Sequence, residues 1–301
     1  MRVLRTVSEW RLRTRSLELG ARTLVMGVVN ITPDSFSDGG VSFTREDAIA
    51  RCLQCLGEGA DILDLGGEST RPGSRAGGAD AAVGADEEQA RLLPVIDRVL
   101  AARPDAVISV DTYKAATANA VLAAGAEIIN DVSGFTWDAD IARVCTEANA
   151  GVILMHTRGK PDEWRTQDRL AGDEVLGMVR DGLSESLTIA GRAGIRRDSI
   201  VLDPGYGFGK RFGENYGLLA RQAELLSLGY PLLAGVSRKS FLGNTLASLH
   251  GGEVAALDQR ENASLAAMVA AILQGASTVR VHSVRAAVEA ARIADAVLDA
   301  E

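Results

Sequence analysis

Short runs of apolar, mostly β-branched residues recur along the chain, and longer amphipathic stretches separate them. The apolar runs lie near residues 24–29, 61–65, 106–110, 126–129, 151–155, 199–202, 231–234 and 277–281. Between most of them are stretches rich in Ala, Leu, Glu and Arg, with examples at 44–57, 85–102, 114–124 and 284–298. This pattern is typical of strands that are buried on both faces and are connected by helices.

Glycines mark the positions where the helices are expected to end. Gly59, Gly125, Gly194 and Gly275 each lie between a helical stretch and the next apolar run, and the left-handed conformation that ends many helices favours glycine. Strand-then-helix repeated eight times predicts an α/β fold, the (β/α)8 or TIM barrel, which uses about 250 residues. A doubly wound open sheet is the alternative, but the regular units favour closure. We expect a single domain over residues 1–301.

An N-terminal β-hairpin is predicted to precede the barrel. Residues 11–24 have the pattern of two short strands, with Gly20 and Ala21 as turn residues. We expect this hairpin to close the N-terminal mouth of the barrel. The Gly/Ala-rich segment 73–84 is interpreted as a loop rather than a linker, because the helix after it belongs to the same repeat.

Charge and hydropathy limit the kinds of partner. The formal net charge of −8 argues against nucleic acid or an anionic membrane surface as the main partner. A small anionic ligand is still possible, because a few local cations outweigh the global sign. No apolar stretch is long enough to span a bilayer, and residues 1–18 lack the hydrophobic core of a signal peptide. We therefore expect a soluble cytoplasmic protein.

Two short patterns look like known motifs but do not match them. Cys52 and Cys55 form a C-x-x-C within a helical stretch, and the third cysteine, Cys145, stands alone. Core packing is the favoured interpretation over a zinc or redox site, since no second cysteine pair exists. The run from Gly205 to Lys210 resembles a nucleotide-binding loop but fails the P-loop spacing.

Polar residues occur at the carboxyl ends of most predicted strands, which is where (β/α)8 barrels carry their active sites. In chain order these ends contain Asn30, 64–73, Asp111, Asn130 with Asp131, Met155 with His156, Asp203, 235–240 and 280–282. A single strand-end Asp is often only the cap of the next helix, and Asp111 and Asp131 are candidates for that role. Helix caps alone, however, would not explain why the strand-end side chains fall into two groups of different chemistry.

The first group of strand-end residues has side chains suited to binding a flat heterocycle. Asp111, Asn130 and Asp203 provide acceptors for amino and ring N–H groups in a deep site, where buried polar pairing gives strong selectivity. Lys239 donates to a carbonyl or ring nitrogen on the opposite edge of the ring. Apolar ring faces are expected from Val132, Met155 and Phe208.

The second group is cationic and rich in amides. It comprises Asn30, Arg71, Arg280 and His282. Such side chains suit phosphate oxygens, and Mg²⁺ is the expected helper because it prefers hard oxygen ligands. The alternative for Arg280 and Lys239 is a surface ion pair that contributes little to stability, and the alternative for His282 is a histidine that is only hydrogen-bonded at a helix start.

These residues lie in stretches that resemble the dihydropteroate synthase family of pterin-binding barrels. The resemblance runs from about Leu24 to the C-terminus. Its marks are 26–40, 59–73, 109–112, 130–134, 203–205, 237–240 and 280–282. The first two stretches and the Ser-Arg-Lys run at 237–239 are highly specific in combination.

The resemblance implies roles for the strand-end residues. It implies that the pterin is held by Asp111, Asn130, Asp203 and Lys239. Further substrate contacts are expected from Val132, Met155, Phe208 and Gly235. It implies that the diphosphate is held by Asn30, Arg280 and His282, with Asn30 next to a Mg²⁺ ion, the expected cofactor.

Two loops are implied to close over the site. The first carries Asp34, Ser35 and Phe36, and the second carries Thr70, Arg71 and Pro72. Ser240 is implied to lie near p-aminobenzoate. The residues expected to act in catalysis are Asp34, Asp111, Asp203 and Lys239. One departure from the family is the run 75–83, which is longer than usual after Pro72.

The implied reaction joins 6-hydroxymethyl-7,8-dihydropterin diphosphate to p-aminobenzoate and releases pyrophosphate, as a step of folate biosynthesis. Asp111 and Asp203 would oppose the positive charge of a pterin methylene cation, so we expect an S_N1-like displacement. No covalent enzyme nucleophile is needed. The family also implies a homodimer formed through the outer helices of the barrel.

Two other functions use the same barrel. A corrinoid methyltransferase that uses methyltetrahydrofolate would keep Asp111, Asn130 and Asp203. It would have no reason to keep the residues of the second, phosphate-type group or the loops that carry Asp34 and Arg71. A non-catalytic paralogue that only binds pterin would have lost Lys239, Arg280 or Asp34, and all three are present. Both alternatives are therefore disfavoured.

Overall fold

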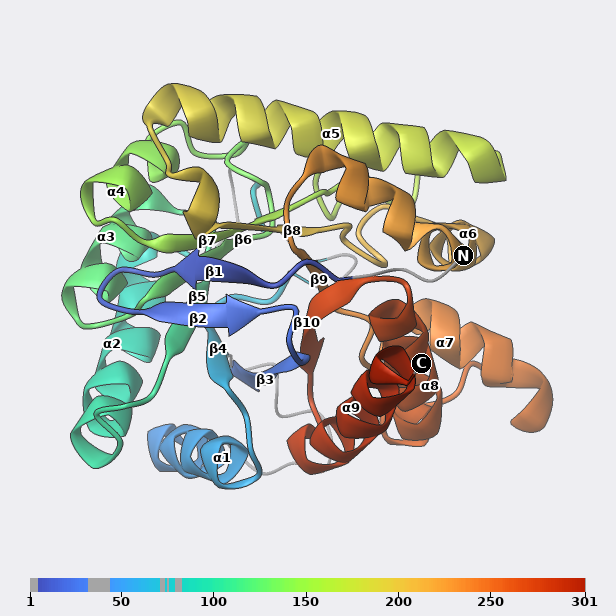
Figure 1. Ribbon diagram of the computed structural model, residues 1–301, viewed down its shortest axis with the longest axis horizontal. Coiled ribbons are helices and arrows are strands. Elements are labelled where there is room, and N and C mark those ends of the chain that lie inside the picture. The colour runs from blue at the N-terminus through green and yellow to red at the C-terminus, as the bar shows by residue number, and fades with distance from the viewer. Residues whose placement is uncertain (1–4, 32–43, 71–73, 75, 79–82, 301) are drawn as a thin grey trace.

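The predicted barrel is confirmed by the fold of the chain. The computed structural model describes residues 5–31, 44–70, 74, 76–78 and 83–300. Eight parallel strands pair in sequence order, and the last pairs with the first to close the barrel (Figure 1). They are β3 (Leu24–Asn30), β4 (Ile62–Gly66), β5 (Ile108–Asp111), β6 (Ile128–Asp131), β7 (Gly151–Met155), β8 (Ile200–Asp203), β9 (Leu232–Ala234) and β10 (Ala276–Val281).

Helices follow the strands and cover the outside of the barrel. They are α1 (Arg45–Gly57), α2 (Ala85–Ala102), α3 (Ala115–Ala123), α4 (Ile141–Glu147), α5 (Gly172–Ala193), α6 (Phe212–Ala220), α7 (Ser240–Thr245), α8 (Glu261–Leu273) and α9 (Val284–Asp299). Short 3-10 turns occur at Arg197–Ser199, Gln222–Leu228, Leu246–Leu249 and Asp258–Arg260. The four predicted cap glycines all have positive φ, as expected. None of the described helices is long and apolar enough to cross a membrane.

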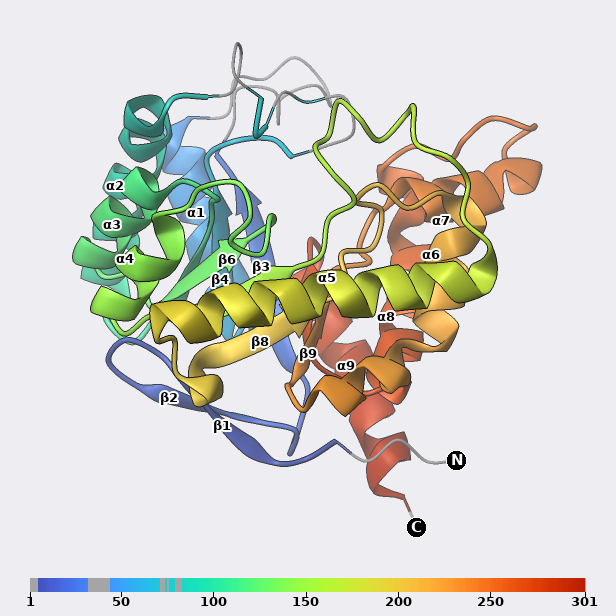
Figure 2. The ribbon, with the colours of Figure 1, turned by 90° about the horizontal axis from the view of Figure 1, so that it is seen from above.

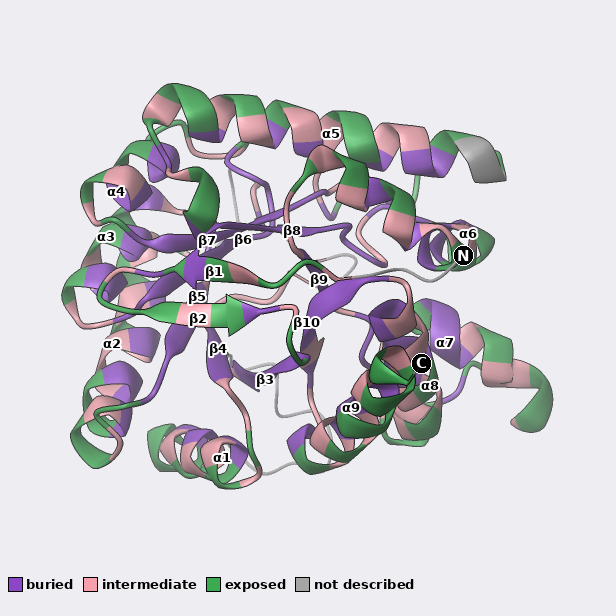
Figure 3. Cartoon of the chain, in the orientation of Figure 1, coloured by how far each residue is buried: buried purple, intermediate pink, exposed green. Residues whose placement is uncertain are grey.

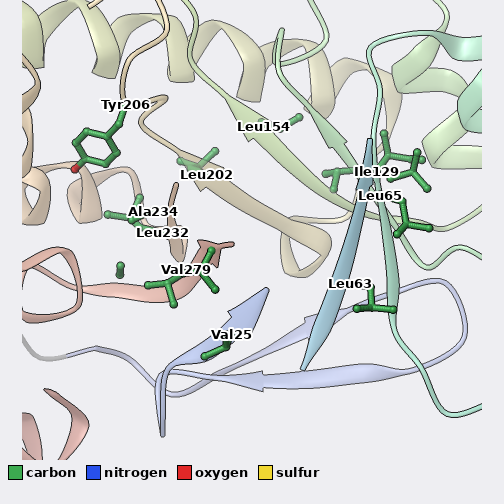
Figure 4. Packing of buried hydrophobic residues seen from close by; sticks show 14 of the residues in the cluster. Val25, Leu63, Leu65, Ile129, Leu154, Leu202, Tyr206, Leu232, Ala234 and Val279 are labelled. Atoms are coloured by element: carbon green, nitrogen blue, oxygen red, sulfur yellow. The ribbon is translucent and has the colours of Figure 1, made fainter. Parts of the chain in front are cut away.

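The alternation of side chains along each strand divides the apolar core into two parts. One set of residues points outward and packs against the helices, as Leu63, Leu65 and Leu154 do in Figure 4. Figure 3 shows the result as buried strands inside a shell of helices with exposed outer faces. Cys52, Cys55 and Cys145 are free thiols in this outer core, which confirms the packing interpretation. Burial raises the pKa of Cys52 to about 12.

The N-terminal hairpin exists, but its predicted limits and turn were wrong. Strands β1 (Ser8–Arg11) and β2 (Ser16–Leu19) pair antiparallel, and the turn is at residues 12–15 instead of Gly20 and Ala21. Gly20 serves the exit of the hairpin instead: its φ is 93°, and a Cβ there would clash with the Thr6 carbonyl oxygen. Glycine therefore marked a close backbone approach, which the sequence pattern does not distinguish from a turn.

The hairpin closes the N-terminal end of the barrel, as expected (Figure 2). Trp10, Leu12 and Leu19 are buried in one cluster with the inward-facing residues at the lower end of the strands. The Trp10 Nε1–H donates to the Ser199 carbonyl oxygen at 2.9 Å. The buried Glu127 carboxylate accepts hydrogen bonds from the Thr14 backbone N–H, at 2.8 Å, and from the Thr14 hydroxyl.

We expect Trp10→Ala to lower the free energy of unfolding by about 3–5 kcal/mol, because it opens a cavity at the centre of this lower core. Urea unfolding monitored by circular dichroism measures the change, and the m-value tests whether the transition stays two-state. Glu9→Ala is the matched control, since Glu9 is the exposed neighbour on the same strand. A loss in Trp10→Ala no larger than in the control would contradict the assignment of the hairpin as part of the core.

Candidate active site

Above the lower core, the inward-facing positions of the strands change from apolar to polar. The period of two places Asp64 two residues above Ile62 on β4, and Asn130 two residues above Ile128 on β6. The strand register aligns Asp64 with Ser109 and Asp111 with Asn130. Polar side chains from several strands therefore meet in two adjacent layers at the carboxyl end of the barrel.

Arg280 binds two carboxylates inside this polar layer. Its Nε–H donates to Asp64 Oδ2 at 2.6 Å, and an Nη–H donates to Asp111 Oδ2 at 2.9 Å. Asp64 is fully buried and also accepts from the Ser109 hydroxyl at 2.7 Å and from the Asn130 amide at 3.2 Å. The carboxylates come from β4 and β5 and the guanidinium from β10, so the cluster spans the seam where the barrel closes.

Asp64 was not identified as a site residue from the sequence. The available signal was a carboxylate within the apolar run 62–65, in phase with the residues that face the barrel interior. Asp64 is the first residue of the strand-end stretch 64–73, but the sequence pattern assigned it no role. A charged residue in the middle of a buried strand needs a partner, and Arg280 provides it.

The electrostatic environment of Asp111 and Arg280 reflects this pairing. Burial raises the pKa of Asp111 to about 7, and the Arg280 guanidinium opposes the shift. Although burial lowers the pKa of Arg280, Asp64 and Asp111 together raise it above its ordinary value. Only 16% of the Asp111 side chain is exposed. This carboxyl group therefore lies deep in the barrel mouth but is still accessible to a ligand.

Asp203 and Lys239 are two further buried, opposite charges of the site, and each opposes the effect of burial on the pKa of the other. Asp203 is buried at the end of β8, where its Oδ1 accepts the Gly205 N–H at 2.7 Å and burial raises its pKa. The Lys239 ammonium lies 3.9 Å from the centroid of the Phe208 ring. Burial, and to a smaller extent the Arg280 guanidinium, lowers the pKa of Lys239 to about 7, while the Asp203 carboxylate opposes this shift.

An apolar wall lies beside these charges. It is made by the cluster of Ala76, Tyr113, Val132 and Met155, with Trp137 and Phe208 packed against it. The structure thus brings the three predicted apolar residues together. Tyr113 and Trp137 were not predicted. Their rings make an edge-to-face contact, with 5.1 Å between the ring centroids. Nothing in the sequence pattern distinguished them from ordinary loop and helix-start residues.

The wall also holds part of the Gly/Ala-rich segment. The Gly77 N–H donates to the Tyr113 hydroxyl at 2.9 Å, and a Cβ at Gly77 would lie 2.7 Å from the Trp137 ring. Near the ends of the segment, Glu68 Oε1 accepts the Val83 N–H at 3.1 Å. Described residues of this segment therefore pack against the barrel mouth, in agreement with its interpretation as a loop of the barrel.

The residues predicted for the diphosphate lie on neighbouring strands. Asn30 ends β3 and is half-buried, and His282 follows β10, with its Nδ1 3.0 Å from the Ser237 hydroxyl. Ser240 is exposed at the start of α7, and Thr70 is half-buried after β4. The predicted residues Asp34, Ser35, Phe36, Arg71 and Pro72 lie outside the described residues.

Neither aspartate caps the next helix, because the N-cap of α3 is Lys114 and that of α4 is Asp140. Asp131 is fully buried, and its two carboxylate oxygens accept the backbone N–H groups of Ser133, at 2.7 Å, and Phe135, at 2.9 Å. Asp111 has no such role, since the Ala115 N–H at the start of α3 is bound by Asp138 at 2.8 Å. Asp131 therefore stabilises its own turn, while Asp111 faces the site.

A closed barrel whose carboxyl end holds buried charges beside an apolar wall has the architecture of a barrel enzyme with its ligand site at that end. Comparison with known protein families shows which family of barrel enzymes this is. The family described as "Pterin binding enzyme" matches residues 26–282, so the chain belongs to the pterin binding enzymes.

Individual relatives narrow the family further. The dihydropteroate synthase of Bacillus subtilis is 38% identical over 284 residues, which are 94% of this chain and 92% of that protein. The structure of Xanthomonas albilineans dihydropteroate synthase with 4-aminobenzoic acid has a TM-score of 0.84 and 40% identity, covering 98% of this chain and 100% of that one. A Coxiella burnetii dihydropteroate synthase in complex with pteroic acid has a TM-score of 0.83 and 33% identity, covering 98% and 100%. Within the pterin binding enzymes, the chain is thus a member of the dihydropteroate synthase family.

The low pKa of Lys239 leads to a prediction about stability and pH. In the unfolded chain Lys239 has a pKa near 10.5, and in the folded protein about 7. Between these pH values the unfolded state binds more protons, so this residue makes the folded protein more stable as pH rises from 7 to 10. We expect Lys239→Met to be more stable than the wild type at pH 7, with the difference shrinking toward pH 10.

Urea unfolding at a series of pH values measures this difference. Lys160→Met, which removes the same charge from the loop after β7, is the control and should keep a constant difference. A constant difference for Lys239→Met as well would show that its ammonium is not desolvated by the site.

Proposed function

We propose that the protein condenses 6-hydroxymethyl-7,8-dihydropterin diphosphate with p-aminobenzoate to give 7,8-dihydropteroate and pyrophosphate, a step of folate biosynthesis. The observation that carries the proposal is the polar layer of Asp64, Asp111, Asn130 and Arg280 within the barrel of a dihydropteroate synthase family member. The relatives with 4-aminobenzoic acid and pteroic acid support the same substrate class.

In this proposal the pterin lies in the deep part of the site. Asp111, Asn130, Asp203 and Lys239 pair with the polar edges of the ring, and Val132, Met155 and Phe208 contact its faces. Gly235 leaves room beside the ligand, because a Cβ there would lie 3.6 Å from Asp203 Oδ2. A buried set of fixed donors and acceptors rejects rings that cannot satisfy it.

The diphosphate is proposed to lie nearer the surface, against Asn30, Arg71, Arg280 and His282. Arg280 also binds Asp64 and Asp111, so the phosphate and pterin groups of residues share this side chain. The loops that carry Asp34, Ser35, Phe36, Thr70 and Pro72 are proposed to cover both substrates, with Ser240 near p-aminobenzoate.

Mg²⁺ is proposed as the cofactor, next to Asn30. Among the described residues no group of three or more His, Cys, Asp or Glu is arranged to hold a metal ion. Mg²⁺ keeps several waters and takes substrate phosphates as ligands, so a single amide oxygen fits an ion held mainly by the diphosphate. Gly66 leaves space beside Asn30, since a Cβ there would lie 3.5 Å from Asn30 Oδ1. When bound, the ion would neutralise charge on the leaving diphosphate.

The proposed displacement is S_N1-like. The bond between the pterin methylene carbon and the diphosphate oxygen breaks first, and its electron pair leaves with the diphosphate. The Asp111 and Asp203 carboxylates stabilise the resulting methylene cation. The amino nitrogen of p-aminobenzoate then forms the new C–N bond and loses a proton to solvent. Such a step needs no covalent nucleophile from the chain.

A homodimer is proposed to form through the outer helices near α6 and α7. Exposed apolar side chains in this region are Phe212, Tyr216, Leu249 and Val254. Contiguous exposed apolar patches mark association surfaces, and we propose that these side chains contribute to one. We expect sedimentation of the purified protein to give a dimer, and Phe212→Glu to shift it toward the monomer. A monomeric wild type would contradict this part of the proposal.

The proposal is tested by dihydropteroate formation from the two substrates with Mg²⁺. We expect Arg280→Ala to lower kcat/KM by at least about 100-fold, because removing the cation leaves two buried carboxylates unpaired. Arg285→Ala, at an exposed position on α9, is the matched control and should retain activity. Binding of the pterin diphosphate without turnover in the wild type would indicate a non-catalytic paralogue.

The order of bond breaking is tested by omitting p-aminobenzoate. We expect slow pyrophosphate release without the amine and nearly equal rates with amines of different nucleophilicity. Release that depends strictly on the nucleophilicity of the amine would contradict the S_N1-like step but not the overall reaction.

A further inference from the structure

A lysine that the proposed reaction does not use is buried in the loop that carries Phe208, one of the proposed pterin contacts. Lys210 is 6% exposed and ends the loop 205–210 that follows β8. Its Nζ donates to the Gly205 carbonyl oxygen at 2.7 Å and to those of His156 and Phe208, each at 3.3 Å. One of these carbonyl groups follows β7 and two belong to the loop itself, so the side chain connects the two segments.

Three carbonyl oxygens match the three N–H donors of an ammonium ion. A neutral amine has two N–H donors and a lone pair, and the lone pair would then face a carbonyl oxygen. Burial lowers the pKa of Lys210 to about 7, and the nearby Asp203 carboxylate raises it. The geometry therefore favours the charged form, held by carbonyl groups as a bound cation would be.

The loop depends on such a connection because its backbone is unusual. Gly205, Gly207 and Gly209 all have positive φ, between 70° and 81°. Glycine loses more conformational entropy than other residues when it is ordered, so a loop with three glycines needs strong local contacts. Other contacts are the Gly207 N–H to Asn215 Oδ1, at 2.7 Å, and the Arg158 N–H to the Phe208 carbonyl oxygen, at 3.3 Å.

The loop in turn orients three residues of the site. The Gly205 N–H binds Asp203 Oδ1 at 2.7 Å, and the Phe208 ring lies 3.9 Å from the Lys239 ammonium. The Phe208 ring also makes an edge-to-face contact with the Trp164 ring, with 5.3 Å between the ring centroids. A shift of the loop would therefore move Phe208 away from Lys239 and release the Asp203 carboxylate from its orientation.

We propose that Lys210 is a positioning residue whose ammonium ion ties the loop 205–210 to the end of β7 and so fixes Asp203, Phe208 and Lys239 for pterin binding. The pterin part of this inference rests on the proposed function. The part that concerns the loop does not.

The loop is tested first in the ligand-free protein, by hydrogen exchange of the peptide that covers residues 203–211. We expect the amides of this peptide to exchange at least about 10-fold faster in Lys210→Met, which keeps most of the side-chain volume but removes the ammonium group. Lys160→Met is the matched control and should exchange as the wild type does. Unchanged exchange in Lys210→Met would overturn the proposal whatever the protein binds.

The site is tested with 6-hydroxymethyl-7,8-dihydropterin, which carries no diphosphate, by titration calorimetry. We expect its Kd to rise at least about 10-fold in Lys210→Met, and the effects of Lys210→Met and Lys239→Met to be non-additive in the double variant. Additive effects, or a Kd equal to that of Lys160→Met, would overturn the positioning role. A wild type that does not bind this pterin would instead count against the proposed function, while the exchange result still decides the loop.

Lys210→Gln guards against a variant that fails to fold. It keeps two N–H donors on a shorter, neutral side chain, so we expect exchange and affinity between those of the wild type and of Lys210→Met. A glutamine variant with wild-type exchange and wild-type affinity would overturn the requirement for an ammonium ion.

Discussion

The bonds from Arg280 to Asp64 and Asp111 are the interactions on which the barrel mouth depends. Each of the three groups would be costly to bury alone. Together they satisfy one another, and Ser109 and Asn130 complete the set around Asp64. The cluster also joins β10 to β4 and β5 across β3, so it ties the last strand to the second and third strands of the closed barrel. The charged side chains that line the candidate ligand site thus also link strands across the seam of the barrel.

The two ends of the barrel solve different problems. At the lower end the hairpin adds Trp10, Leu12 and Leu19 to the inward-facing residues and excludes water. This dry core stabilises the strands, and so the upper end is free to carry buried charges that stabilise little by themselves. Stability at one end and chemistry at the other is the general division of (β/α)8 barrels. On β4 the change from the apolar lower core to the charged upper end takes only two residues, from Ile62 to Asp64.

The fold could be predicted well because strands and helices leave periodic apolar patterns in the sequence. The site could be predicted only in part because contacts between side chains of different strands leave no such pattern. Strand and helix positions follow from alternating apolar patterns. That Arg280 would bind Asp64 and Asp111, and so link the two chemical groups, depends on contacts between strands far apart in sequence. The hairpin turn was misplaced because Gly20 relieves a clash rather than forming a turn. The run 205–210 was rejected as a nucleotide-binding loop because it fails the P-loop spacing. The sequence did not show that Lys210 binds backbone carbonyl groups of this same run.

The charges around the proposed pterin site also bear on the chemistry. Asp64, Asp111 and Asp203 face Arg280, Lys210 and Lys239, so three potential anions are set against three potential cations. A neutral pterin ring can enter such a set without leaving a net buried charge. In the proposed S_N1-like displacement, the methylene cation that is left when the diphosphate departs would lie near the Asp111 and Asp203 carboxylates. Fixed dipoles and charges stabilise such a state without reorganisation. The rigidity that Lys210 gives to the Asp203 side of the site is therefore as relevant to the transition state as to binding.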